Sequence, residues 1–289
     1  MSAAVETRTP SLIWSSDRAE VWNANCLDEA VVDGIIGKRK ADLLCFDAPY
    51  SDAVHSGHDA QVASLKESFA TNVVGGRRTR EQTYAARVAA GTSAGRRALD
   101  YAAWGNEEIE RFCGIWLPRA VGWFVTITDH VLAPKWAAAC FARNLYVFPP
   151  LPLVETGSRV RMAGDGPSGW TCWLIVARPR KEPWASWGTC RGAYVVPGER
   201  EINSRGGTGR VVGGKPLMAM QQIIMDYSRR DALVVDPTSG GGTTGRAALG
   251  TGRRFVGLEQ DPGRASLTAK ACAAVNVGQR EMFGEGVGT

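Results

Sequence analysis

Several features that define other classes of protein are missing from this sequence of 289 residues. No apolar run reaches the length of about 18 residues that a membrane-spanning helix needs. The N-terminus lacks the basic-then-apolar pattern of a secretion signal. The seven cysteines are scattered and odd in number, and no two have the Cys-x-x-Cys spacing of a zinc cluster. We therefore expect a cytoplasmic protein without a disulfide framework.

Short apolar runs alternate with segments of helical periodicity along most of the chain. Residues 1–13 are expected to form a loose terminus, and residues 157–169 a loop. Strands are predicted at 41–46, 122–128, 145–148, 170–178, 232–236 and 253–259. Helices are predicted at 27–36, 107–117, 136–143, 216–227, 243–249 and 264–274. The alternation predicts an α/β fold with a mainly parallel sheet covered by helices on both faces.

The segment VVDPTSGGGTTGRAALGTGRRFVGLEQD (234–261) combines a strand, a glycine-rich turn, a helix and a second strand. This order is typical of a βαβ unit that binds a nucleotide or nucleoside, with an acid such as Glu259 on the ribose hydroxyls. The lysine of a phosphate-binding loop is absent, which argues against an ATPase or kinase. A dinucleotide and S-adenosylmethionine (SAM) remain. Asp236 favours SAM, because its carboxylate would repel a pyrophosphate and would suit an amino group.

The run LLCFDAPYSD (43–52) ends a buried strand in an aspartate, a proline and an aromatic residue. Asp47-Ala48-Pro49-Tyr50 resembles the [Asp/Asn/Ser]-Pro-Pro-[Tyr/Phe] motif of amino-DNA methyltransferases. DPTSGGGTT (236–244) resembles their Asp-Pro-Phe-x-Gly-Ser-Gly-Thr-Thr loop. KPLMAMQQII (215–224) is similar to their Lys-Pro-x-x-Leu helix, and NANCLDEAV (23–31) to their Gly-Asp-Cys-Leu-x-x-Leu opening. The order of the four motifs is that of the β-class members of this family.

This resemblance implies a Rossmann-like methyltransferase fold, with a sheet of the seven-stranded type, and methylation of an exocyclic amine on a base flipped out of DNA. Such an amine is a poor nucleophile, because its lone pair is delocalised into the ring. The Asp47 carboxylate and the Ala48 backbone carbonyl would accept the amine hydrogens and aim the lone pair at the methyl group. Tyr50 would stack on the base, and Pro49 would stiffen the turn.

The resemblance also assigns a SAM site, with S-adenosyl-L-homocysteine as the product. The opening segment would hold the adenine, Glu259 the ribose, and Lys215 would help at the methionine carboxylate. The implied cofactor-binding residues are Asn25, Cys26, Leu27, Lys215, Asp236, Pro237, Thr238, Ser239, Gly240, Gly242, Thr243, Thr244, Glu259 and Gln260.

Two positions depart from the family pattern. Ala48 stands where the family usually has proline, which keeps the carbonyl but loses part of the rigidity. Asn25 stands where the family has aspartate, and asparagine can both donate and accept a hydrogen bond. Asp47 favours adenine N6 as the target, since family members with serine at this position mostly methylate cytosine N4. Both bases stay open.

Arginine is concentrated in two places where DNA could be held. The chain has 34 lysines and arginines against 29 acidic residues, a net charge of +5 that is compatible with nucleic acid. Within an expected insertion at 52–105, a DNA contact is predicted for Arg77, Arg78, Arg80, Arg96 and Arg97. A short target-recognition region is expected at 179–214, with Arg191 and Arg205 as DNA contacts and with Trp184 and Trp187 beside them.

Other functions stay open beside this interpretation of residues 1–289 as a single methyltransferase domain. Loss of catalysis through Ala48 would leave a protein that binds SAM and DNA, and a dinucleotide-dependent oxidoreductase would bind NAD instead. His55 and His58 are three positions apart, but a zinc site needs three or four ligands and amine methylation needs no metal, so none is expected. Double-stranded DNA is the expected partner. A homodimer and a cognate restriction nuclease are compatible with the family.

Overall fold

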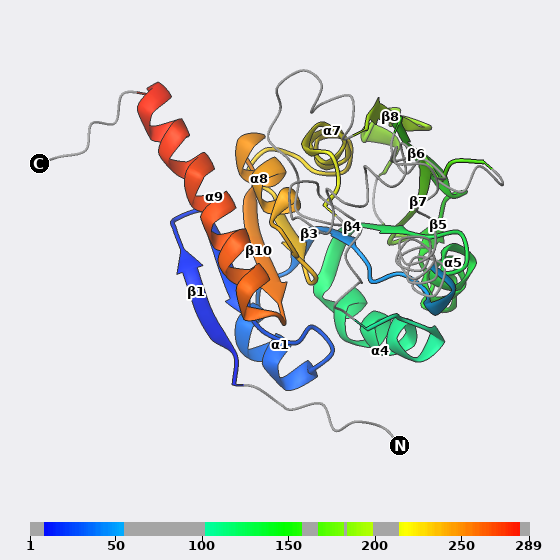
Figure 1. Cartoon of the computed structure of the whole chain (residues 1–289). Helices are drawn as coiled ribbons and strands as arrows, with labels where there is room; N and C mark the ends of the chain where they lie inside the picture. Colours follow the sequence, from blue (N-terminus) through cyan, green and yellow to red (C-terminus); the bar gives the residue numbers. More distant parts are fainter. Residues whose placement is uncertain (1–8, 55–101, 158–166, 182–183, 199–213, 284–289) are drawn as a thin grey trace, which may run out of the picture. The chain divides into compact units, whose positions relative to one another are not determined.

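The computed structural model describes residues 9–54, 102–157, 167–181, 184–198 and 214–283 (Figure 1). The chain divides into two compact units. The first contains residues 1–48 and 106–289, and the second contains residues 49–105. The second unit includes the whole of the insertion expected at 52–105, of which residues 55–101 lie outside the described part.

The first unit is built on one sheet, which has ten strands among the described residues. The order across the sheet is β1-β2-β10-β9-β3-β4-β7-β6-β8, and β5 pairs with β7. The strands are β1 (Ser11–Ser15), β2 (Ala19–Asn23), β3 (Ala41–Asp47), β4 (Ala120–Thr128), β5 (Tyr146–Val147), β6 (Leu151–Thr156), β7 (Thr171–Arg178), β8 (Tyr194–Pro197), β9 (Leu233–Asp236) and β10 (Arg254–Glu259).

The centre of the sheet is parallel. Strands β2, β10, β9, β3 and β4 all run in one direction, whereas β7 pairs with β4 antiparallel and β1 pairs with β2 antiparallel. The carboxyl ends of the five parallel strands therefore reach the same edge of the sheet, where α/β proteins bind their ligands. Four of these ends are Asn23, Glu259, Asp236 and Asp47.

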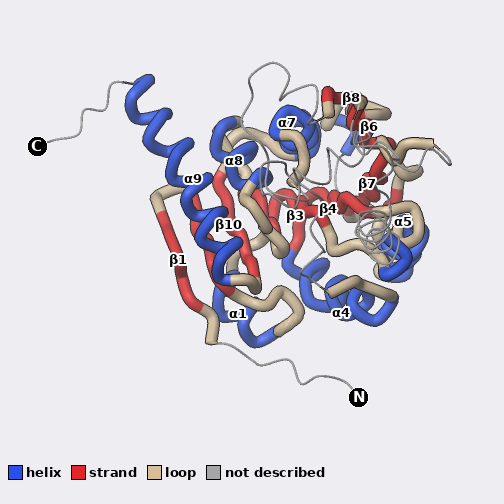
Figure 2. Tube along the Cα trace, in the orientation of Figure 1, coloured by secondary structure: helices blue, strands red, loops and turns tan. Residues whose placement is uncertain are grey.

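Helices cover both faces of this sheet, as predicted (Figures 1 and 2). On one side lie α7, α8 and α9, which pack against one another in that order. On the other side lie α1, α4 and α5. Their bounds are α1 (Glu29–Ile36), α4 (Asn106–Trp116), α5 (Ala133–Ala142), α7 (Leu217–Tyr227), α8 (Thr243–Gly250) and α9 (Pro262–Phe283). No helix in the described ranges is long and apolar enough to cross a membrane.

The central strands form where the sequence has short apolar runs that are buried on both faces. In β3, residues 43–46 are each fully buried, and in β4 the residues from Trp123 to Thr128 are all buried. A strand covered on both faces has no polar alternation, so its apolar run is continuous. This explains why the sequence predicted β3, β4, β7, β9 and β10 to within two residues.

The edge of the sheet corrects the expectation of a loose terminus at 1–13. Residues 11–13 belong to β1, which is mostly exposed and pairs with β2, so it lacks the buried pattern that identifies a strand. Strands β2, β6 and β8 were also missed. Pro152 in β6 argues against a strand when only the sequence is considered. Helix α9 begins two residues before the predicted start and ends nine residues beyond the predicted end.

Gly122 lies where β4 closely approaches the backbone of β3. A β-carbon at this position would lie 2.0 Å from the Asp42 backbone oxygen. Because that oxygen belongs to the sheet backbone, the clash cannot be relieved by a rotamer change. We expect Gly122→Ala to lower the free energy of unfolding by more than about 2 kcal/mol, measured by urea denaturation.

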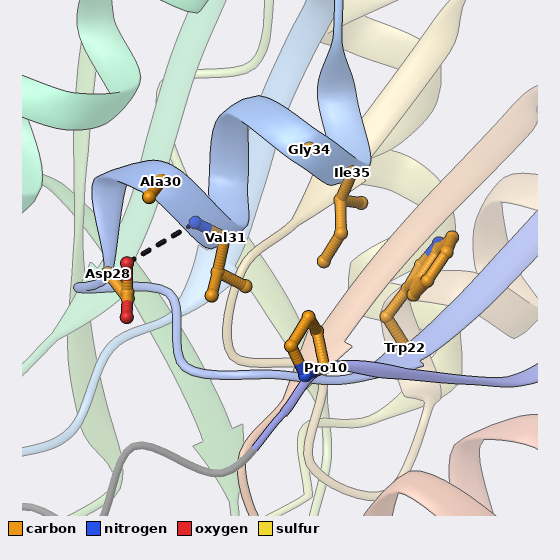
Figure 3. Close-up of a pocket in the computed structure, with 7 residues that line it drawn as sticks. All are labelled: Pro10, Trp22, Asp28, Ala30, Val31, Gly34 and Ile35. Atoms are coloured by element: carbon orange, nitrogen blue, oxygen red, sulfur yellow. Dashed lines mark hydrogen bonds between the residues drawn. The ribbon is translucent and has the colours of Figure 1, made fainter.

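Gly34 provides the matched control. It lies in α1 beside a groove of about 430 Å³, with Val31, Ile35 and Trp22 among its lining residues (Figure 3). A β-carbon there would meet no atom within 4 Å. Gly34→Ala should therefore stabilise the protein by about 0.5–1 kcal/mol through helix propensity. Equal effects of the two substitutions would contradict the steric account of Gly122.

Candidate active site

Asp47 lies at the carboxyl end of β3, and two backbone contacts fix that end. The Ala48 N–H donates to the Ile127 carbonyl on β4 at 3.1 Å. The Thr238 hydroxyl, in the turn after β9, donates to the Asp47 carbonyl at 3.1 Å. The two segments that the sequence singled out, 43–52 and 234–261, therefore meet at this edge.

The Asp47 side chain forms an ion pair with Lys215. The lysine ammonium donates to Asp47 Oδ2. The lysine side chain is only 4% exposed, whereas the aspartate side chain is 28% exposed. Lys215 was expected to help at a methionine carboxylate, which stays a prediction, and the structure places its ammonium on the predicted catalytic acid. A pair of this kind keeps a carboxylate ionised and fixes its rotamer.

Asp236 is the most deeply buried acid at this edge, with 2% of its surface exposed. Its carboxylate accepts the Thr238 N–H at 3.0 Å and the Thr244 hydroxyl. Burial raises the pKa of Asp236 to about 7, and the nearby negative charges of Asp47 and Glu259 act in the same direction. The position therefore favours a bound cation, because a positive charge would offset the cost of ionising Asp236.

Glu259 ends β10 and is held by the backbone on both sides. Its Oε2 accepts the Gly240 N–H at 2.9 Å, and its Oε1 accepts the Asp261 N–H at 2.8 Å. Burial is the main cause of a raised pKa for this carboxyl group. Each carboxylate oxygen has a second lone pair, so Glu259 can still accept hydrogen bonds from a ligand diol.

The opening segment lies directly beside Glu259. The Ala24 N–H donates to the Glu259 carbonyl at 3.0 Å, and the Leu27 N–H donates to Asn25 Oδ1 at 2.9 Å. The Cys26 carbonyl accepts the Trp116 indole N–H at 2.9 Å. Residues 25–27 are thus brought to the same edge as Glu259, with the Asn25 side chain folded back onto its own turn.

The glycine-rich turn serves packing more than the sequence suggested. Gly240 has a φ of +52° and Gly242 a φ of +83°, which favour glycine. A β-carbon on Gly242 would lie 2.8 Å from Thr268 Cα in α9. The Ser239 side chain is buried and donates to the Thr268 hydroxyl at 3.4 Å. A side chain on Gly242 would therefore clash with α9, and the Ser239 hydroxyl binds α9 directly. Both residues were assigned to the cofactor from the sequence.

Of the remaining cofactor residues, two lie in or beside the same turn and one lies just beyond β10. Pro237 is buried between Asp236 and Thr238, and Thr243 is the first residue of α8. Gln260 is exposed just beyond β10, and its backbone carbonyl accepts the Asn23 side-chain amide at 3.0 Å.

The other two motif residues after Asp47 and Ala48 belong to the second unit. Ala48 itself is buried at the end of β3. Pro49 begins the second unit, and within it the Tyr50 carbonyl accepts the Trp104 N–H at 3.1 Å. The roles assigned to Pro49 and Tyr50 stay predictions.

The aromatic side chains of the predicted recognition region pack on the first unit. The rings of Trp184 and Trp187 pack on Trp123 at centroid distances of 5.1 Å and 5.5 Å. Arg191 forms an ion pair with Asp226 in α7. These contacts anchor the segment to the first unit. Arg205 lies outside the described residues, and so do seven other positions considered from the sequence: Arg77, Arg78, Arg80, Arg96, Arg97, His55 and His58.

Sequence reasoning missed two residues that shape this edge. The Asn23 side-chain amide donates to the Glu259 carbonyl at 2.8 Å, which joins the ends of β2 and β10. Trp116 holds the opening segment from α4. No local pattern marks either contact, because each joins residues at least 90 positions apart.

Comparison with known proteins identifies part of the chain. Residues 195–270 match a family model described as DNA methylase, of the N6/N4 methyltransferase type. A segment of 90 residues is 33% identical to the type II methyltransferase M.BglI of Bacillus subtilis, and one of 47 residues is 43% identical to M2.MboI of Moraxella bovis. These segments cover 31% and 16% of this chain, and 24% and 17% of the relatives. The resemblance to amino-DNA methyltransferases is thus confirmed, in sequence, over the part that contains the glycine-rich turn.

Solved structures confirm the fold over most of the chain. The M1.HpyAVI–SAM complex superposes with a TM-score of 0.56 at 16% identity, covering 88% of this chain and 98% of the other. The PvuII DNA methyltransferase, described as cytosine-N4-specific, superposes with a TM-score of 0.50 at 10% identity, covering 93% and 94%. The chain therefore has the Rossmann-like fold of SAM-dependent methyltransferases.

Replacing Asp236 by asparagine should stabilise the protein at neutral pH. The unfolded chain releases this proton near pH 3.8, whereas the folded chain holds it until about pH 7, so stability falls as the pH rises through this window. Asparagine does not titrate and keeps an oxygen for the Thr238 N–H. The gain over wild type should grow across the window by at most about 1.4 kcal/mol per pH unit and stay constant above it.

Urea unfolding at a series of pH values measures this difference. Asp236→Ala loses the Thr238 and Thr244 contacts as well, so it should be less stable than the asparagine variant while showing the same dependence on pH relative to wild type. A difference between wild type and Asp236→Asn that does not change with pH would contradict the account.

Proposed function

We propose that the chain is a SAM-dependent DNA methyltransferase that methylates the exocyclic amine of a base, with adenine N6 as the favoured target. The observation that carries this proposal is the hydrogen bond from Thr238 to the Asp47 carbonyl, which joins the glycine-rich turn to the acid at the end of β3. A methyl donor on that turn and an amine on Asp47 would then be neighbours. The match to the DNA methylase family model and the names of the type II relatives support DNA as the substrate.

The residues at this edge fit SAM in charge. Asp47, Asp236 and Glu259 place three carboxylates at neighbouring strand ends, with Lys215 on the first of them. SAM carries an ammonium group and a sulfonium group, and a cation would offset the cost of ionising Asp236. Asp236 is therefore assigned to the ammonium group and Glu259 to the ribose hydroxyls. When bound, SAM would supply the electrophilic methyl group.

The chain's own residues would act by position and electrostatics. The Asp47 carboxylate would accept one hydrogen of the target amine and the Ala48 carbonyl the other, which draws the nitrogen toward a tetrahedral geometry. The lone pair is then free to attack, and no covalent bond to the protein is needed. Aspartate at this position supports adenine, and both adenine and cytosine could present an amine to the same two acceptors.

The direct test is mass spectrometry of nucleosides from unmethylated duplex DNA incubated with the protein and SAM. We expect N6-methyladenine with the wild type and at least a 100-fold lower rate with Asp47→Ala, since a lost hydrogen bond to the reacting centre costs about this much. Asp17→Asn, an exposed aspartate in the turn between β1 and β2, is the matched control and should keep the wild-type rate.

The other outcomes are equally informative. N4-methylcytosine would keep the mechanism and replace the base. Binding of SAM without any methylated nucleoside would contradict the proposed activity and favour a silent SAM-binding and DNA-binding protein. Binding of NAD in place of SAM would favour an oxidoreductase.

A further inference from the structure

We propose that Lys215 is a positioning residue for Asp47: its ammonium holds Oδ2 of the carboxylate and so fixes the orientation in which the carboxylate meets the target amine. The inference rests on the proposed function and deepens it. It also replaces the role expected from the sequence, in which Lys215 contacts the carboxylate of the cofactor. The two roles differ in which reactant depends on the lysine.

Lys215 is more deeply buried than Asp47, as expected if the lysine supports the aspartate and the aspartate meets the substrate. The lysine side chain is 4% exposed, and the aspartate side chain is 28% exposed. The ammonium is therefore shielded from solvent, while part of the aspartate side chain is still exposed. Removing an ammonium from water is costly unless a partner compensates for it, and the carboxylate of Asp47 provides such compensation for Lys215.

The backbone around Lys215 is also fixed. Pro216 follows it as the N-cap residue of α7, with a φ of −58°, and Met220 N–H donates to the Pro216 carbonyl at 3.1 Å. Helix α7 packs against β3, the strand that ends at Asp47. At its other end, Asp226 accepts the Tyr194 hydroxyl at 2.8 Å. A lysine on so constrained a backbone is suited to hold one geometry.

Asp236 shows what the same edge does to an acid that lacks such a cation. Burial and the neighbouring carboxylates raise the pKa of Asp236 to about 7. A protonated acid would be a poorer acceptor for the amine hydrogen. The positive charge of Lys215 offsets the cost of ionising Asp47. At Asp236, a cationic ligand would offset the corresponding cost.

The test uses Lys215→Met, which keeps the length and apolar volume of the side chain but removes the charge, and Lys215→Arg, which keeps the charge. Lys40→Met is the matched control, because Lys40 is an exposed lysine that donates to the Pro118 carbonyl away from this edge. SAM affinity is measured by calorimetry. Single-turnover methyl transfer to DNA at saturating SAM is measured across pH.

We expect Lys215→Met to lower the single-turnover rate about 10- to 100-fold while the SAM dissociation constant changes less than about threefold. The acid limb of the rate profile should move to higher pH, because Asp47 without its cation takes up a proton more readily. Lys215→Arg should recover part of the rate, and Lys40→Met should behave as wild type.

Three results would overturn the inference. One is SAM binding that weakens tenfold or more while the rate at saturating SAM is unchanged, which would assign Lys215 to the cofactor. Another is a Lys215→Met variant whose SAM affinity and single-turnover rate both equal those of the wild type. The third is a loss of both with an unmoved acid limb, which would indicate a structural role.

A separate measurement distinguishes failure of this inference from failure of the proposed function. If the wild type methylates no base, the proposed function fails whatever Lys215 does. The pairing is then tested by the melting temperatures of Lys215→Met, Asp47→Asn and the double variant. Non-additive changes in melting temperature would show that Lys215 and Asp47 are energetically coupled, and additive changes would show that they are not.

Discussion

The parallel pairing of β2, β10, β9, β3 and β4 is the constraint on which the candidate site depends. It brings five strand ends to one edge, where the ladder of backbone hydrogen bonds stops. Loops and side chains complete it: Ala24 N–H binds the Glu259 carbonyl, and the Thr238 hydroxyl binds the Asp47 carbonyl. The bonds that finish the sheet are thus the same bonds that hold the acids in place.

Concentrating acids at this edge has an electrostatic cost in the ligand-free protein. Asp236 is buried near two other carboxylates, and its raised pKa is the measure of that cost. Glu259 offsets part of its own cost with two backbone N–H groups, and Asp47 offsets its cost with Lys215. A protein selected for stability alone would replace such groups with apolar residues. Their presence is best explained by a cationic ligand that uses them, which agrees with the proposed SAM site.

The sequence was informative wherever a residue's role follows from its local pattern. The buried strands and the acids at their ends could be predicted, because a continuous apolar run followed by a polar residue marks a strand end. The ion pair of Lys215 with Asp47 could not, since it joins residues 168 positions apart and depends on how α7 docks. The packing constraint on Gly242 could not be predicted for a similar reason, because its neighbour Thr268 is placed by α9.

Helix α7 connects the predicted recognition region with the Asp47 site. At its C-terminal end, Asp226 binds the Trp187 indole through its carbonyl at 2.8 Å and pairs with Arg191 through its carboxylate. At its N-terminal end, the helix follows Lys215 directly. Trp184 and Trp187 pack on Trp123, and Arg191 pairs with Asp226, so these residues anchor the described part of the recognition region to the first unit. Helix α7 thereby sets the distance between this anchor and Lys215.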